Sequence, residues 1–256
     1  MSLVPLTLAA PDLWRAAGML APMPRAVRRP HTGGRRAVGT LAAVVATLGL
    51  AGCAGLGQPV QYDSPGINGL VIPTPTPDPD DFVAGVDNPW LPLEPGSRWR
   101  YDVTGAGQAL GTIDVEVVGG TTDVAGLSAT AVRTTSRIDG QTDVETRLFT
   151  QDEDGNVWLV GVESAGGLSW RAGEGGAEAG LAMPADPRLG DGWLTYLVPT
   201  LPEASTTVED QSREMVQTRE SGWGEADSTT RKVYASGVGL VSVEDLDSGW
   251  LAQLAD

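Results

Sequence analysis

Residues 147–160 read RLFTQDEDGNVWLV, and this stretch decides the fold class. Two short segments rich in aromatic and β-branched residues flank Asp154-Gly155, a dipeptide that favours the positive φ angles of a tight hairpin turn. The stretch therefore predicts two antiparallel strands joined by a turn.

The strand pattern continues on both sides of this hairpin. In the alternating segment 112–117, Ile113, Val115 and Val117 would share one face. Further strands are predicted at 98–104, 127–138, 142–151, 156–162, 206–217, 229–235 and 240–246. No helix-period segment of twelve or more residues occurs after residue 82, so alternating strand–helix architectures are disfavoured. We expect an all-β fold, in which residues 82–256 form one domain of curved antiparallel sheet, a half-barrel or open barrel-like structure.

Residues 168–193 are the least regular part of this domain, with several glycines and prolines. A loop of this length is often a lid or a binding loop, or else it is mobile. The sequence leaves these alternatives open.

The motif Leu50-Ala51-Gly52-Cys53 resembles the bacterial lipobox, where lipoprotein signal peptides are cleaved. An arginine-rich segment and an apolar run at 37–50 precede it, which is the layout of a secretory signal. The run has 14 residues, fewer than the roughly 20 that a membrane-spanning helix needs. We therefore expect 23–52 to be a signal peptide and Cys53 to be lipidated, which would anchor the chain to the cell membrane on its extracytoplasmic side.

The segments around this signal have different expected roles. Residues 1–22 fit no part of it, and Met23 is the expected start. Residues 53–81 comprise the lipidated cysteine and a linker rich in glycine and proline, which we interpret as a disordered tether. The export route, general or twin-arginine, stays open because the residues flanking Arg35-Arg36 match the twin-arginine motif poorly.

The charge and residue content exclude several function classes. After cleavage the chain would carry 11 basic and 32 acidic residues, a net charge of about −21, so nucleic acid is not an expected partner. The only histidine, His31, lies in the signal, and Cys53 is the only cysteine. The mature chain would therefore have no Ser-His-Asp triad, no Cys-His pair, no disulfide and no His/Cys metal site. No cofactor is expected.

The turn at 152–156 allows a second interpretation, as a calcium site. Asp152, Asp154 and Asn156 alternate, and Glu163 follows eleven residues after Asp152, in a pattern similar to an EF-hand loop. The position where that loop needs glycine is occupied by Val157, so we favour a simple hairpin turn.

Seven tryptophans fall after Cys53, and most tryptophans in a β domain fill its core. Trp158, Trp170 and Trp193 are the candidates for lining a ligand-binding face, where they would stack on sugar rings. A glycosidase would in addition need two carboxylates flanking the scissile bond. The candidates for such a pair are Glu145, Glu163, Glu174 and Glu178.

Four motifs together resemble a family of secreted bacterial proteins of unknown function. They are NPWLPL at 88–93 with Pro95-Gly96 and Trp99-Arg100-Tyr101, Gln151-Asp152 with residues 155–158, Met183-Pro184-Ala185, and KVYA at 232–235 with GVGLV at 237–241. The resemblance covers nearly all of the domain and implies no catalytic residues. In plan, a lipobox followed by a strand-rich domain is also similar to envelope lipoproteins whose half-barrel shelters acyl chains.

Three functional hypotheses follow. The first is a membrane-anchored, non-enzymatic module that binds a hydrophobic or amphipathic envelope ligand, as the lipid anchor and curved sheet suggest. The second is a carboxylate-dependent hydrolase of cell-wall glycans, and the third is an envelope scaffold that binds another protein. The expected partners are the membrane, through the anchor, and a lipid or glycan ligand.

Overall fold

The computed structural model describes residues 78–255. The predicted signal peptide, Cys53 and nearly all of the tether lie outside the described residues. Within them, no helix is long and apolar enough to span a bilayer. A short 3-10 helix, η1 (Pro79–Asp81), is followed by fifteen strands. These are β1 (Phe82–Val83), β2 (Arg98–Gly105), β3 (Gln108–Val117), β4 (Thr122–Val124), β5 (Leu127–Ile138), β6 (Gln141–Asp152), β7 (Val157–Ser164), β8 (Trp170–Arg171), β9 (Glu178–Met183), β10 (Gly192–Leu197), β11 (Ala204–Gln211), β12 (Met215–Ser221), β13 (Thr229–Ala235), β14 (Gly239–Asp245) and β15 (Trp250–Leu254).

The strands form one antiparallel sheet whose hydrogen bonding runs in a ring. From β2 onward each long strand pairs with the next along the chain, and β1, β4 and β8 pair at the margins with β6, β5 and β7. The pairing of β15 with β2, together with the pairing of β7 with both β6 and β9, completes the ring. The predicted all-β fold with a curved antiparallel sheet is confirmed.

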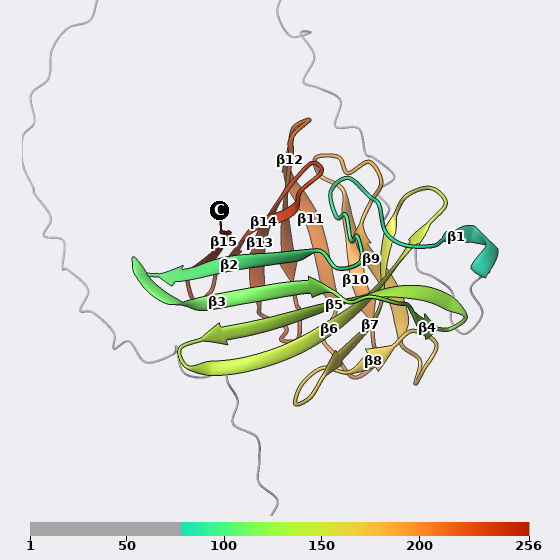
Figure 1. Cartoon of the computed structure of the whole chain (residues 1–256), viewed down its shortest axis with the longest axis horizontal. Coiled ribbons are helices and arrows are strands. Elements are labelled where there is room, and N and C mark those ends of the chain that lie inside the picture. The colour runs from blue at the N-terminus through green and yellow to red at the C-terminus, as the bar shows by residue number, and fades with distance from the viewer. Residues whose placement is uncertain (1–77, 256) are drawn as a thin grey trace, which may run out of the picture. The chain divides into compact units, whose positions relative to one another are not determined.

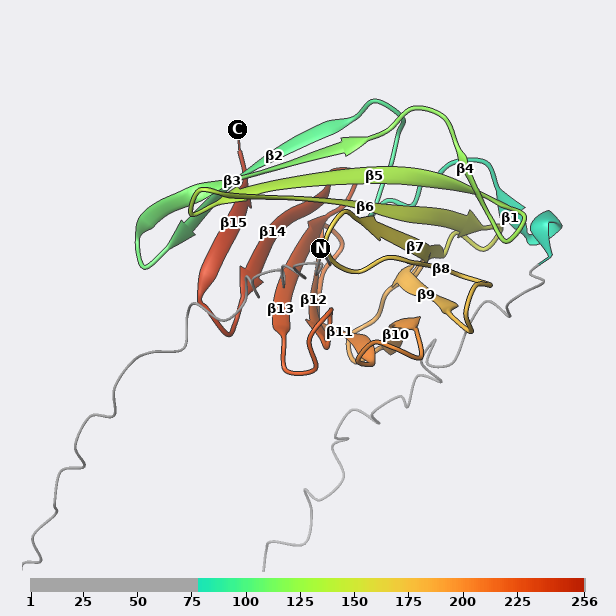
Figure 2. The same ribbon diagram turned by 90° about the horizontal axis from the view of Figure 1, so that it is seen from below.

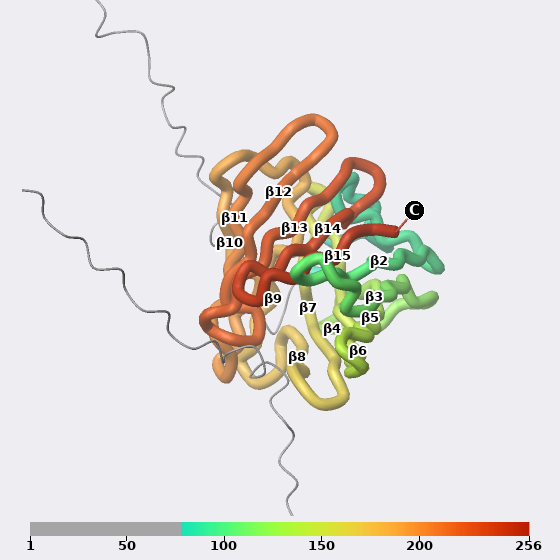
Figure 3. Tube along the Cα trace, turned by 90° about the vertical axis from the view of Figure 1, so that its left-hand side faces the viewer, coloured from blue at the N-terminus to red at the C-terminus, as the bar shows by residue number. Residues whose placement is uncertain are grey.

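The sheet curves into two layers that face each other. Strands β2, β3, β5 and β6 lie together in one layer, and β11–β14 cross behind it (Figure 1). Seen from below, the same four strands form a roof over β11–β15 (Figure 2). On the other side, β7 and β9 lie between the two groups (Figure 3). The curvature therefore gives the sheet an inner face, on which the core forms.

The predicted hairpin at residues 147–160 is confirmed. Gln151 pairs with Val157, the Gly155 N–H donates to the carbonyl of Asp152, and Gly155 has a φ of 88°. An L-residue with a Cβ rarely adopts this φ, which explains the Asp-Gly sequence.

Strand alternation sends one side of several strands into the core, whereas residues 157–162 of β7 are all buried. In β12, Val216, Thr218 and Glu220 are buried, while the intervening residues are half-buried. The main apolar cluster gathers side chains from both layers, including Val117, Val132, Val162 and Val216. A smaller cluster of Tyr101, Val103 and Ala252 forms where β2 meets β15.

Two sequence expectations need correction. The predicted strand 206–217 is two strands, because the chain turns at residues 212–214, where the Ser212 N–H donates to the carbonyl of Met215. Residues 168–193 are not one irregular loop, since they contain β8, β9 and the start of β10. Gly180 in β9 packs so closely on β10 that an added Cβ would lie 2.3 Å from the carbonyl carbon of Thr195. This glycine weakens the strand signal in the sequence, but the pairing requires it.

The four motifs of the family resemblance meet around Asn88. The Asn88 side chain donates to the carbonyls of Gly155 (2.9 Å) and Pro184 (3.1 Å) and accepts from the N–H of Trp90 and Leu91. Its own N–H donates to the side chain of Gln151 (2.9 Å). The Gly237 N–H donates to the carbonyl of Pro89 (2.7 Å). These segments therefore hold the chain preceding β2 against the ring.

Candidate functional site

Charged side chains from three strands gather on the inner face of the sheet. We call this group the inner charged cluster; it consists of Glu145 and Arg147 from β6, Glu220 from β12 and Lys232 from β13. Glu145 pairs with Arg147, with Nε and Oε1 2.6 Å apart, and Lys232 pairs with Glu220, with Nζ and Oε2 2.5 Å apart. The cluster holds two acids and two bases and is therefore neutral as a whole.

The register of the sheet explains why these charges point inward. Arg147 lies opposite Val132 on one side and Val162 on the other, and both valines belong to the main core. Lys232 lies opposite Thr218, which is buried, and directly opposite residues of an antiparallel pair share a face. The charged side chains thus lie on the same side of their strands as the core residues.

The inner charged cluster is only partly withdrawn from solvent. The side chain of Arg147 is 29% exposed and that of Glu145 is 18%, whereas those of Lys232 and Glu220 are 14% and 7%. Ions fully removed from water lose several kcal/mol of solvation each, so the remaining access lowers the cost of this arrangement. It also leaves Arg147 and Glu145 within reach of a molecule that enters from solvent.

Aromatic rings form one wall of the cluster. The guanidinium carbon of Arg147 lies 3.9 Å from the centroid of the Trp223 ring, within the range of a cation–π interaction. Trp223 packs edge-on against Tyr196, with 5.3 Å between the ring centroids, and the centroids of Tyr196 and Trp170 are 5.7 Å apart. The Tyr196 hydroxyl donates to the carbonyl of Gly222 and accepts from the N–H of Gly224. Tyr196 therefore fixes the loop that carries Trp223.

The charges alter the ionisation of neighbouring groups. Burial opposes the Arg147 charge, but the carboxylates of Glu145 and Glu220 outweigh it, so the pKa of Arg147 is raised. Burial, reinforced by the charge of Glu220, raises the pKa of Tyr234 well above its usual range. The tyrosine therefore stays neutral and can serve as a hydrogen-bond donor.

Apolar side chains continue the inner face beyond the charges. Trp99, Val115 and Leu240 are half-buried and pack against both apolar clusters. Ile113, Val243 and Trp250 are also half-buried and pack against the smaller one. The inner face thus combines ionic groups with partly accessible apolar surface, the two kinds of contact that an amphipathic molecule requires.

The three tryptophans predicted to line a ligand face lie in the core. Trp158, Trp170 and Trp193 are 4%, 8% and 2% exposed. Their rings therefore offer no surface for stacking on a sugar from solution. Trp158 donates through Nε1 to Asp152 at 2.8 Å, whereas Trp170 touches the aromatic wall through Tyr196.

Two residues of the calcium interpretation, Asp152 and Asn156, form hydrogen bonds within the turn. Both carboxylate oxygens of Asp152 accept hydrogen bonds, from Asn156 and from Trp158. Asn156 also accepts from the N–H of Ala185, and Glu163 pairs with Arg171. In the described part of the chain, no three His, Cys, Asp or Glu side chains are grouped to hold a metal ion.

The four carboxylates considered for glycan hydrolysis are dispersed. Glu145 is in the inner charged cluster, whereas Glu163 is exposed and paired with Arg171. Glu174 is exposed in the turn between β8 and β9, and Glu178 begins β9. Glu220, the second carboxylate of the inner cluster, was not among the residues proposed from the sequence.

Sequence reasoning missed Arg147, Glu220, Lys232 and Trp223. A signal for two of them exists in the strand alternation: Lys232 stands two residues before the buried Tyr234, and Glu220 stands four after the buried Val216. Glu220 and Lys232 lie on the neighbouring strands β12 and β13. The approach of this pair to Arg147 of β6 has no sequence signal, because it depends on the curvature of the sheet.

Comparison of the chain with protein-family models, with curated proteins and with solved structures gives no match.

Proposed function

We propose that this chain is an extracytoplasmic lipoprotein, anchored through Cys53, whose β domain binds an amphipathic envelope ligand and catalyses no reaction. The polar head of the ligand would contact the inner charged cluster, and its apolar part would lie on the half-buried side chains beside it. The motif resemblance to secreted bacterial proteins agrees with an envelope location.

The observation that carries this proposal is the position of Arg147 and Glu145 at the border of an apolar inner face. A charged pair in such a place costs solvation energy, and the fold alone would be served by apolar residues. A ligand head group would share the hydrogen-bonding capacity of Arg147, whose guanidinium has five N–H donors. The hydrolase has less support, because each carboxylate of the inner charged cluster is already paired with a base.

Ligand binding can be tested with the soluble chain that begins at residue 54 and lacks the lipid. Native mass spectrometry would detect a copurified lipid, and titration with a fluorescent fatty acid would measure affinity. Quenching of tryptophan emission that is lost in the variant Trp223→Phe would report binding next to Arg147. We expect saturable binding at one site per chain.

Two variants and one control locate the binding site. Arg147→Met and Lys232→Met should each weaken fatty-acid binding by about tenfold, since each removes a charge-assisted contact or its support. Arg219→Gln, which removes an arginine paired with Glu209 on β11, should bind as the unaltered chain does. A chain that carries no lipid and takes up no fatty acid would refute the proposal.

A further inference from the structure

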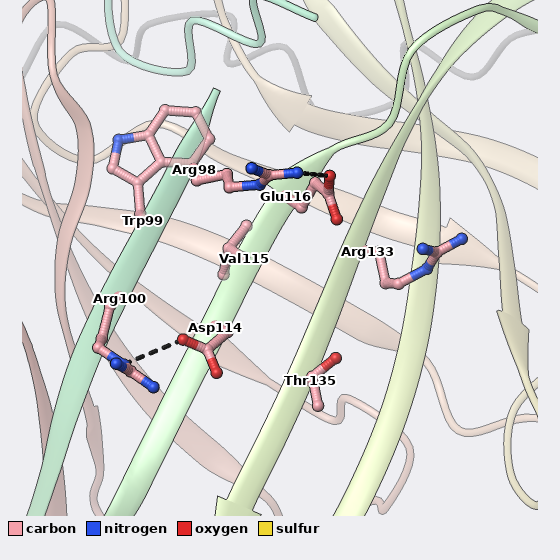
Figure 4. A pocket seen from close by; sticks show the side chains of 8 residues that line it. All are labelled: Arg98, Trp99, Arg100, Asp114, Val115, Glu116, Arg133 and Thr135. Carbon is pink, nitrogen blue, oxygen red and sulfur yellow. Dashed lines mark hydrogen bonds and ion pairs between the residues drawn. The ribbon is translucent and has the colours of Figure 1, made fainter. Parts of the chain in front are cut away.

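A shallow groove of about 350 Å³ lies on the β2–β3–β5 layer, and its charged walls are on the outer face, opposite the inner charged cluster. Its charged side chains come from three neighbouring strands: Arg98 and Arg100 from β2, Asp114 and Glu116 from β3, and Arg133 from β5 (Figure 4). Thr135 of β5 and parts of Trp99 and Val115 complete its lining. We call it the arginine groove.

The sheet register arranges these side chains in rows across the strands. In the register of the strands, Glu116 lies directly opposite Arg98 on one side and Arg133 on the other. Asp114 lies opposite Arg100 and Thr135. The ion pairs follow this grid: Arg98 lies 2.5 Å from Glu116, and Asp114 lies 3.0 Å from Arg100 and 2.5 Å from Arg137. Two carboxylates are therefore surrounded by four guanidinium groups.

Positive charge is in local excess here, although the chain as a whole is strongly acidic. Arg133 is exposed and forms no ion pair with any described residue, yet it lies close enough to Glu116 to help lower the pKa of that carboxyl, after the larger effect of Arg98. The outer ladder on β11–β14 differs, because there Arg219 and Arg231 face two carboxylates, Glu209 and Glu244. That ladder is balanced, whereas the arginine groove is not.

The excess guanidinium groups have free hydrogen-bonding capacity. Arg98 and Arg100 have exposed side chains, 73% and 60%, and each uses only part of its donors on a carboxylate. Guanidinium forks match the oxygens of phosphate and carboxylate groups, and the hydroxyl of Thr135 adds a further donor. Screening confines repulsion by the distant acidic residues to roughly 8 Å at physiological salt.

We propose that the arginine groove binds a phosphate-bearing anion, with Arg133 as its main contact and Arg98 and Arg100 as supporting ones. The same chemistry is presented by a phospholipid head group and by a soluble phosphate ester. The charged side chains of this site lie on the face of the layer opposite the inner charged cluster, and the groove shares only Trp99 and Val115 with the inner face described above.

The test uses the full mature lipoprotein in uncharged detergent micelles, with arginine side chains labelled with ¹⁵N. One titration adds glycerol phosphate, and a second adds phosphatidylglycerol to the micelles. We expect the Nε–H signals of Arg98, Arg100 and Arg133 to shift in at least one titration and the shifts to shrink with added salt. A shift only with the lipid identifies a head group as the source, and a shift only with the ester identifies a soluble ligand.

Variants separate a built site from general charge attraction. Arg133→Gln should weaken the binding that is seen by about fivefold, in keeping with an exposed ionic contact. Arg133→Lys should restore only part of it, because the planar fork is lost. Arg219→Gln removes the same charge from the balanced ladder and should leave binding unchanged. The proposal is overturned if neither titration shifts these signals, or if Arg219→Gln weakens binding as much as Arg133→Gln.

Discussion

The guanidinium group of Arg147 stacks on the ring of Trp223, with 3.9 Å between its central carbon and the ring centroid, and it also pairs with Glu145. One side chain thus joins β6 to the loop between β12 and β13, from opposite layers of the sheet. The contact offsets part of the solvation cost of a charge at a position opposite two core valines.

Replacing Arg147 with methionine should lower the free energy of unfolding by about 1–2 kcal/mol, because the cation–π contact is lost and Glu145 is left without its partner. Urea unfolding followed by circular dichroism would measure the change. Arg171→Met is the matched control, since its pair with Glu163 is more exposed and should contribute less than about 0.5 kcal/mol. Equal effects of the two variants would contradict a special role for Arg147.

Asn88 should be among the most sensitive positions of the fold. It is 2% exposed, and Asn88→Ala would remove its side-chain hydrogen bonds to the carbonyls of Gly155 and Pro184 and to the N–H of Trp90 and Leu91. We expect the free energy of unfolding to fall by about 2–4 kcal/mol, which a shift of the urea midpoint would measure. Asn88→Asp keeps the acceptor but turns an oxygen toward two carbonyls, so it should be at least as harmful. A mild effect of both variants would show that the surrounding segments hold without Asn88.

Asp152 distinguishes the turn from a calcium site. If its carboxylate organises the turn, Asp152→Ala should cost about 2–3 kcal/mol through the loss of hydrogen bonds to Asn156 and Trp158, with or without calcium. Millimolar calcium should leave the melting temperature of the unaltered chain unchanged. A rise of several degrees with calcium, absent in the variant, would instead support metal binding.

Stability should fall in alkaline solution because of the buried tyrosines. Burial raises the pKa of Tyr101 and of Tyr234 above the usual tyrosine value of about 10. Below about pH 10 the folded and the unfolded chain both keep these protons, so the two tyrosines contribute their full stabilisation of the fold. Above it the unfolded chain releases protons that the folded chain keeps, and the free energy of unfolding falls by up to about 1.4 kcal/mol per pH unit for each tyrosine.

Urea midpoints between pH 8 and pH 11.5 would test this dependence. In Tyr234→Phe, the free energy of unfolding should decline less steeply with pH, by the slope that corresponds to about one proton. The stability of this variant near pH 8 should change little by comparison. Identical slopes for the variant and the unaltered chain would show that Tyr234 does not titrate as proposed.

Membrane attachment should depend on one sulfur atom. Cys53→Ser should abolish labelling with radioactive palmitate and move the protein from the membrane fraction to the soluble fraction after cell lysis, because only the thiol accepts the lipid. Ala54→Ser, one residue further on, should leave both unchanged. A Cys53→Ser protein that is still acylated would refute the lipoprotein proposal.

Local features of the sequence predicted the strands well where β-branched and aromatic residues are frequent. The strands predicted at 127–138 and 229–235 have the same bounds in the structure, and the Asp154-Gly155 turn is confirmed. Prediction failed at residues 178–183, where glycine and alanine serve close packing on β10 and give little strand signal. The inner charged cluster could not be predicted either, because Arg147 and Lys232 are 85 positions apart and meet only through the curvature of the sheet.

The pairing of β15 with β2 also determines when this protein can fold. The strand that pairs with this edge of β2, residues 250–254, is synthesised long after β2, so β2 has a free edge until these residues have been made. Unpaired strand edges are templates for aggregation, and contacts between distant segments form slowly. A chain that stops before residue 250 should therefore be prone to aggregation, and a chaperone that shields the β2 edge would protect the nascent protein until β15 has been made.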